Sequence, residues 1–239
     1  MSKLRLLNLD PVTYASSPEE LEYMTRFLGA DMVLETRAIA NGPATIENPR
    51  DEAFAAPGVI EACIQAEKDG YHGVFVNCFA DPGVHAARTC VSIPVFGGFE
   101  PVMLTAMGMG HKIGIITVTP QVLGMLGDIV AKEGLGSHVA CIRSVGIPVQ
   151  ELRDMERLCK ALKKEALAAV NEQGAQVIVL GCTAMIGVAE RLRELLMEEG
   201  CSAPVLEAAQ CGIAMLEMYA KMGLSHSRLT YLPMNKGEN

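Results

Sequence analysis

The sequence predicts an α/β protein of two pseudo-symmetric lobes, each a mainly parallel sheet flanked by helices. Short apolar runs alternate with longer helical patterns along the chain, which is typical of parallel sheets with helical crossovers. In addition, residues 70–78 and 174–182 each run from a glycine through an apolar burst to a cysteine. This is an internal repeat of about a hundred residues, and it predicts two sheets of the same kind.

The individual elements follow from local patterns. Apolar runs that are rich in β-branched residues and bounded by turn residues are expected to form strands. They are residues 4–9, 32–38, 73–77, 95–97, 112–117, 140–145, 176–181 and 205–207. Segments rich in alanine and charge flank each glycine-to-cysteine stretch and predict helices over 57–69, 82–89, 152–173 and 187–199.

The repeat also predicts the domain organisation. We expect a first lobe over residues 1–118, which carries Cys78, and a second lobe over 119–215, which carries Cys182. A C-terminal segment, 216–239, is expected to return to the first lobe. Lobes packed in this way would face each other across an active-site cleft, with one thiol on each side of a small molecule.

Composition excludes several classes of partner. The net charge is −8 and no block of Lys and Arg occurs, which argues against nucleic acid and anionic membrane surfaces. The sequence contains neither a signal peptide nor an apolar run of about 20 residues, so we expect a cytoplasmic location and a small-molecule substrate.

The eight cysteines predict neither disulfides nor a metal site. Their density is below that of a small secreted scaffold, and no Cys-x-x-Cys pair is present. The sequence also lacks the dinucleotide fingerprint, a phosphate loop and a pyridoxal signature. Chemistry without a cofactor is therefore expected.

Cys78 and Cys182 are the candidate catalytic residues. Each comes at the carboxyl end of an expected strand, where open α/β sheets bind ligands. A helix that follows each cysteine is expected to lower the thiol pKa. A thiol and a thiolate on opposite faces of a carbon acid suit two-base racemisation. The backbone N–H groups expected to stabilise the carbanion follow the cysteines and belong to Phe79, Ala80, Thr183 and Ala184.

Other polar residues end expected strands and are candidates for substrate binding. Thr117 and Thr119 follow one apolar run, and Asn8 and Asp10 close another. Their side chains could reach a ligand at the carboxyl edge of a sheet. A Cys-His dyad with His85 is a weaker alternative, because His85 lies two helical turns beyond Cys78.

Four segments together carry a family resemblance. They are Gly42-Pro-Ala-Thr-Ile-Glu47, Asn77-Cys-Phe-Ala-Asp-Pro-Gly83, Gly181-Cys-Thr-Ala-Met185 and Ser225-His-Ser-Arg-Leu-Thr-Tyr-Leu-Pro233. With them the chain resembles the hydantoin racemase and allantoin racemase branch of the aspartate/glutamate racemase superfamily.

The resemblance implies a function and further site residues. It implies a cofactor-independent racemase of 5-substituted hydantoins or related cyclic ureides such as allantoin, with a catalytic cysteine from each lobe and a homo-oligomeric state. The matching segments add Pro43, Gly181 and Thr183 as expected substrate contacts.

One stretch departs from that branch. Its first strand commonly ends in Asn-Pro-Asn, whereas this chain has Asn8-Leu9-Asp10-Pro11. An ionised Asp10 only accepts hydrogen bonds. An anion near the substrate would disfavour a carboxylate and favour N–H donors, so a neutral ring is expected rather than free aspartate or glutamate.

Two classes of alternative remain open. The chain could catalyse another reaction of the superfamily, as an amino-acid racemase or a maleate cis-trans isomerase, although few Arg or Lys lie in the strand-end loops to hold a dicarboxylate. It could instead be a thiol redox switch or a small-ligand binder. Replacing either cysteine distinguishes the racemase hypothesis from the binder hypothesis, because a two-base racemase loses turnover while a binder keeps its affinity.

Overall fold

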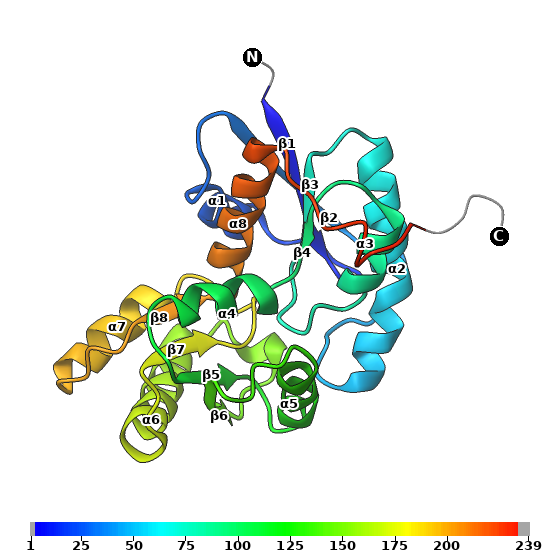
Figure 1. Ribbon diagram of the computed structural model, residues 1–239. Coiled ribbons are helices and arrows are strands. Elements are labelled where there is room, and N and C mark those ends of the chain that lie inside the picture. Colours follow the sequence, from blue (N-terminus) through cyan, green and yellow to red (C-terminus); the bar gives the residue numbers. More distant parts are fainter. Residues whose placement is uncertain (1–2, 234–239) are drawn as a thin grey trace. The chain divides into compact units, whose positions relative to one another are not determined.

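The computed structural model describes residues 3–233 and divides the chain into two compact units. The first unit contains Met1–Ile46, Arg50–Gly98 and Gly212–Asn239, and the second contains Glu47–Pro49 and Phe99–Cys211 (Figure 1). Across the described residues, no helix has the length and apolar character needed to cross a membrane.

Each unit holds a four-stranded, fully parallel sheet, and the two sheets have the same strand order. The first is β2 (Met32–Ala38), β1 (Leu4–Asp10), β3 (Gly73–Val76) and β4 (Val95–Phe96). The second is β6 (Val139–Ser144), β5 (Ile113–Thr117), β7 (Val177–Leu180) and β8 (Val205–Glu207). Every strand expected from the sequence is present, with its ends displaced by one residue at most, and the predicted fold class is confirmed.

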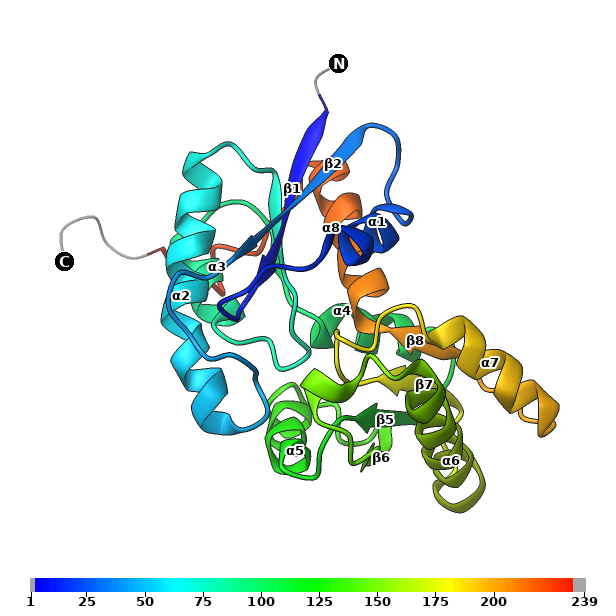
Figure 2. The ribbon, with the colours of Figure 1, turned by 180° about the vertical axis from the view of Figure 1, so that it is seen from behind.

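In the first unit, helices cover both faces of the sheet (Figures 1 and 2). The helices α2 (Pro49–Lys68) and α3 (Val84–Cys90) pack on alternate apolar residues of β1 and β3, among them Leu7 and Val74. The helices α1 (Pro18–Thr25) and α8 (Ala208–Met222) lie on the opposite face. There α8 approaches so closely that a Cβ at Gly212 would lie 2.2 Å from the Phe75 ring.

The second unit repeats this plan. The helix α6 (Met155–Gln173), preceded by a 3-10 turn (Val149–Glu151), packs on β5 and β6, and α7 (Ala189–Glu198) packs on α6 and β8. The helix α4 (Phe99–Met107) contacts β7 and β8, and α5 (Val122–Lys132) contacts β6.

The glycine of each repeat ends a helix. Gly70 and Gly174 adopt φ of 79° and 73°, in the left-handed region that glycine enters without steric cost. The next N–H then bonds back into the helix, from Tyr71 to the Ala66 carbonyl and from Ala175 to the Ala169 carbonyl. In both repeats, the segment from the glycine to the cysteine therefore contains the end of a helix, a short loop and one buried strand of four residues.

The boundary between the units differs from the one expected. Residues 99–118 belong to the second unit, because β5 pairs with β6 and β7. The C-terminal segment from Gly212 onward groups with the first unit, and residues 234–239 of it lie outside the described part of the chain.

Several helix starts also differ. The sequence placed a helix start at Pro57, but α2 begins at Pro49 and passes through Pro57. The helix after Cys78 starts at Val84 and not at residue 82, because Asp81 and Gly83 both have positive φ, which a right-handed helix excludes.

Candidate active site

The two cysteines occupy equivalent positions in the two sheets. In the first sheet Leu9 of β1 pairs with Val76, the last residue of β3; in the second, Ile116 of β5 pairs with Leu180, the last residue of β7. One residue separates each of these strand ends from its cysteine. Cys78 and Cys182 therefore leave the carboxyl edges of their sheets in the same register, and both are partly exposed.

Around Cys78 the main chain is tied to two neighbouring strands. The Asn77 N–H donates to the Leu9 carbonyl at 2.8 Å, and the Cys78 carbonyl accepts the Gly98 N–H at 2.9 Å. The Cys78 N–H donates to the Val76 carbonyl at 2.7 Å. The position of this cysteine is thus fixed from both sides by backbone hydrogen bonds.

The turn after Cys78 closes against the end of β4. Asp81 has φ of 52° and is the only residue other than glycine with positive φ between residues 3 and 233. Its carboxylate lies so close to Gly97 that a Cβ there would be 2.0 Å from Asp81 Oδ1. Asp81 therefore shapes this turn and lies before α3, which begins at Val84.

Asp10 is the centre of a buried hydrogen-bond network. Its carboxylate accepts the Ser16 N–H (2.7 Å), the Ser16 hydroxyl (2.8 Å), the Thr36 hydroxyl (3.0 Å), the Asn77 Nδ2 (2.9 Å) and the Asn8 Nδ2 (3.3 Å). Burial raises the Asp10 pKa, while the hydrogen bonds from Ser16, Asn77 and Thr36 oppose that rise. The sequence placed Asn8 and Asp10 on the substrate. In the structure they bond to each other, and Asp10 also accepts from Asn77, the residue before Cys78.

The second unit holds the residue before its cysteine differently. The Thr117 hydroxyl donates to the Gly181 carbonyl at 3.0 Å, and the Gly181 N–H donates to the Ile116 carbonyl at 2.7 Å. Thr117 is fully buried. Its hydroxyl is thus used within the protein, and Gly181 permits a close approach in which a Cβ would lie 2.8 Å from Ile115 Cγ2.

The Cys182 thiol has a high pKa. Burial of the thiol and, to a smaller extent, the nearby Glu47 charge raise the pKa to about 11, although hydrogen bonds from the Ala184 and Met185 N–H groups oppose the rise. The expectation that a helix lowers this pKa is wrong, since α7 begins only at Ala189. Cys182 is consequently a protonated thiol at neutral pH.

Two carboxylates organise the surroundings of Cys182. Glu207, at the end of β8, is buried and accepts the N–H groups of Ala189 (2.8 Å) and Gly187 (3.0 Å), which fixes the loop that follows the cysteine. Glu47 accepts the Val149 N–H at 3.1 Å.

The remaining predicted residues lie in varied surroundings. Phe79, Ala80 and Thr183 are buried. Thr119 is buried, and among the described residues its hydroxyl has no hydrogen-bond partner. Pro43 is partly buried and its carbonyl accepts the Thr13 N–H at 3.3 Å.

Sequence reasoning missed several polar residues beside the cysteines. Asn77 and Glu47 stand inside the motif segments, and their position there was the available signal. Ser16 and Thr36 gave no local signal, because they meet Asp10 only through a loop and through the pairing of Thr36 with Asn8.

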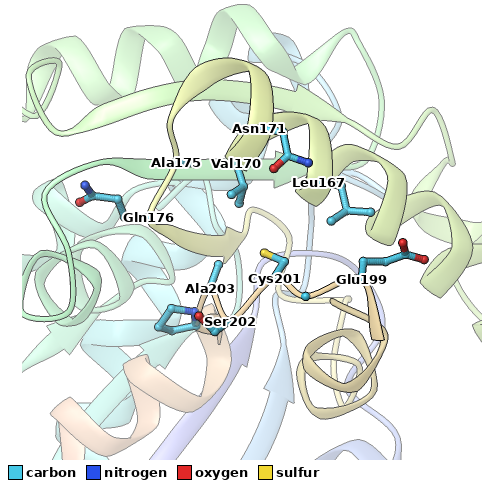
Figure 3. Close-up of a pocket in the computed structure, with 11 residues that line it drawn as sticks. Leu167, Val170, Asn171, Ala175, Gln176, Glu199, Cys201, Ser202 and Ala203 are labelled. Atoms are coloured by element: carbon cyan, nitrogen blue, oxygen red, sulfur yellow. The ribbon is translucent and has the colours of Figure 1, made fainter. Parts of the chain in front are cut away.

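A hollow elsewhere in the second unit is distinct from the Cys182 site. It is lined by α6 residues such as Asn171, by Gln176 and Ala203, and by Cys201 (Figure 3). Gln176 and Ala203 precede β7 and β8, so the hollow lies at the amino ends of the strands, opposite the edge that carries Cys182. In the part of the chain that is described, no cluster of three or more His, Cys, Asp or Glu side chains could hold a metal ion.

Comparison with known proteins agrees with this architecture. A profile of the Asp/Glu/Hydantoin racemase family matches residues 15–216. The hydantoin racemase of Pseudomonas sp. (strain NS671) is 34% identical over 199 residues, which cover 82% of this chain and 78% of the relative. That of Rhizobium meliloti is 32% identical over 188 residues, which cover 78% and 76%.

Solved structures show the same fold. The allantoin racemase from Klebsiella pneumoniae superposes with a TM-score of 0.87 at 27% identity, covering 99% of this chain and 96% of its own. The chain belongs to the Asp/Glu/hydantoin racemase family, and it is an isomerase of the racemase type.

Proposed function

We propose that this racemase inverts the stereocentre of neutral cyclic ureides, such as 5-substituted hydantoins or allantoin, by proton transfer between Cys78 and Cys182 without a cofactor. The observation that carries the proposal is the equivalence of the two cysteines. Each follows the third strand of an identical parallel sheet in the same register, at the edge where such sheets bind ligands. The relatives are hydantoin racemases and an allantoin racemase, which supports the substrate class.

The reaction needs one thiolate and one thiol. The thiolate removes the proton from the ring carbon C5, the electron pair of that C–H bond delocalises into the adjacent carbonyl, and the second thiol delivers a proton to the opposite face of C5. Because burial keeps Cys182 protonated at neutral pH, we assign it as the proton donor in the resting protein and Cys78 as the first base. The roles exchange for the other enantiomer.

The charge of Asp10 supports a neutral substrate. Its hydrogen-bond partners are Asn8, Ser16, Thr36 and Asn77, all of them uncharged, so an ionised Asp10 leaves a net negative charge next to the residue that precedes Cys78. A substrate carboxylate at this place would be repelled, and a buried charge is poorly screened by salt. A ureide ring carries no such charge.

Polarimetry tests the substrate class. Enantiopure 5-substituted hydantoins, allantoin, aspartate and glutamate are each incubated with the enzyme, and optical rotation is followed beside an enzyme-free control. The proposal predicts loss of rotation for at least one ureide and a slower or undetectable loss for both amino acids. Faster racemisation of a free amino acid would overturn the substrate assignment.

A further inference from the structure

We propose that Asp10 is a positioning residue for Cys78: its buried carboxylate fixes the side chain of Asn77, the residue before the cysteine, and does not itself contact substrate. The catalytic part of this inference rests on the proposed function. The structural part concerns the geometry of the Cys78 thiol and stands on the hydrogen bonds of the first unit alone.

The carboxylate has no capacity left for a substrate. A carboxylate offers about four lone-pair sites on its two oxygens. Oδ1 accepts from Asn77 and the Ser16 hydroxyl, and Oδ2 accepts from the Ser16 N–H, Thr36 and Asn8. Asp10 is only 6% exposed. A substrate N–H that bonded to Asp10 would have to displace one of these donors.

The network acts on residue 77 from two directions. The Asn77 N–H bonds to the Leu9 carbonyl, and its side chain bonds to Asp10, the next residue of β1. Asn77 Nδ2 also lies 3.3 Å from Ser16 Oγ, so the loop after β1 joins the same network. Because residue 77 leads directly into Cys78, loss of these side-chain bonds would let the thiol drift, and proton transfer is sensitive to displacements of about 1 Å.

The second unit contains a matched control. Thr117 follows Ile116 in β5, as Asp10 follows Leu9 in β1. Ile116 pairs with the last residue of β7, and Leu9 pairs with the last residue of β3. The Thr117 hydroxyl bonds to Gly181, the residue before Cys182. Thr117→Val therefore removes the hydrogen bond to the residue before Cys182 and leaves the Asp10 network intact.

The test is the rate at which iodoacetamide alkylates each cysteine of the full-length protein, measured by peptide mass spectrometry. Wild type is compared with Asp10→Ala, Asn77→Ala, the double variant and Thr117→Val, each checked for a cooperative thermal transition. We expect both single variants to change the Cys78 rate relative to Cys182 by about fivefold or more, and the double variant to equal a single one, because residues that act through each other are not additive. Thr117→Val should change the Cys182 rate instead.

The variants also separate position from charge. Asp10→Ala removes a carboxylate as well as a hydrogen bond, whereas Asn77→Ala keeps the carboxylate. If both variants change the Cys78 alkylation rate equally, the change is due to the position of Cys78 and not to the charge. If Asp10→Ala does not fold, Asp10→Asn, which keeps the volume, is used with the same expectation. A Cys78 rate that stays within about twofold of wild type, or single effects that multiply in the double variant, would overturn the inference.

Kinetics extend the test to turnover. With a ureide substrate, Asp10→Asn should lower kcat by about tenfold and leave KM within about twofold, because Asp10 does not touch substrate. A rise in KM at unchanged kcat would show direct substrate binding by Asp10 and contradict the inference. If no ureide is racemised, the proposed function fails while the alkylation rates still decide the role of Asp10.

Discussion

In the first half of the chain the residue before the cysteine is held through a buried carboxylate, whereas in the second half it is held through a threonine hydroxyl. Asp10 accepts from the Asn77 side chain, while Thr117 donates to the Gly181 carbonyl. Both arrangements accompany the same main-chain bond, from residue 77 to Leu9 and from residue 181 to Ile116.

The difference shows which parts of a repeat are free to diverge. Parallel pairing uses main-chain groups, so each cysteine follows the same strand end although the side chains around the two cysteines differ. The polar partners have changed: the first half buries the Asp10 carboxyl group, whose pKa burial raises, and the second surrounds its thiol so that the pKa rises to about 11. Two positions that are equivalent in the backbone thus have different polar surroundings.

The comparison predicts that both halves are indispensable. Cys78→Ala and Cys182→Ala should each lower racemisation by about a thousandfold or more, since each removes one of two general acid–base groups. Polarimetry with a 5-substituted hydantoin measures the rates, and Cys201→Ala, in the hollow at the other edge of the second sheet, serves as the matched control and should keep wild-type activity. If either Cys78→Ala or Cys182→Ala kept activity near that of wild type, the prediction that both cysteines are required would be wrong.

The thiol of Cys182 should ionise only at high pH. With a pKa of about 11, its thiolate fraction rises about tenfold per pH unit, so alkylation of Cys182 by iodoacetamide should be about a hundredfold faster at pH 10 than at pH 8. Peptide mass spectrometry separates this rate from that of the other cysteines. A plateau below pH 9 would show that the surroundings of Cys182 stabilise the thiolate instead.

The turn after Cys78 should tolerate no side chain at Gly97. A Cβ there would lie 2.0 Å from Asp81 Oδ1, so Gly97→Ala should lower the free energy of unfolding by about 1–3 kcal/mol. Gly127→Ala in α5 is the control: nothing lies within 4 Å of its Cβ position, and alanine in a helix interior should stabilise by about 0.5–1 kcal/mol. Urea denaturation measures both, and equal effects would argue against a tight Asp81 turn.

The buried carboxyl group of Asp10 should appear in the pH dependence of stability. Burial raises the Asp10 pKa above its ordinary 3.8, so the folded protein binds this proton more tightly than the unfolded chain. The contribution of Asp10 to the unfolding free energy is therefore greatest below about pH 3.8, falls as pH rises through the folded-state pKa, and is constant above it.

Asp10→Asn removes this dependence. Urea denaturation at several pH values should show wild type losing stability relative to the variant as pH rises from about 4. A wild type that gains relative stability over the same range would mean that the hydrogen bonds to Asp10 outweigh its burial.

The sequence predicted the strands well and the site less completely. Apolar runs between turn residues located each strand, because burial on both faces of a parallel sheet leaves a clear pattern. The helix starts at Pro49 and Val84 were missed, since Pro57 resembles a helix start and the positive φ of Asp81 has no signature in the sequence.

The polar network depended on long-range pairing. The location of Cys78 and Cys182 at equivalent strand ends was predictable from the repeat. The meeting of Asp10 with Ser16, Thr36 and Asn77 was not, because it requires the register of β1 with β2 and β3. The high pKa of Cys182 likewise depends on how densely the folded chain surrounds the thiol.

Early isotope exchange can test whether a proton is transferred between two cysteines on opposite faces of the substrate. One enantiomer of a 5-substituted hydantoin is incubated with wild-type enzyme in D₂O, and the deuterium at C5 of the product and of the remaining substrate is measured by mass spectrometry after chiral separation. With two bases, we expect product that carries solvent deuterium while the remaining substrate is still protonated. Product that retains the original proton would show that a single base acts on both faces and would contradict the account.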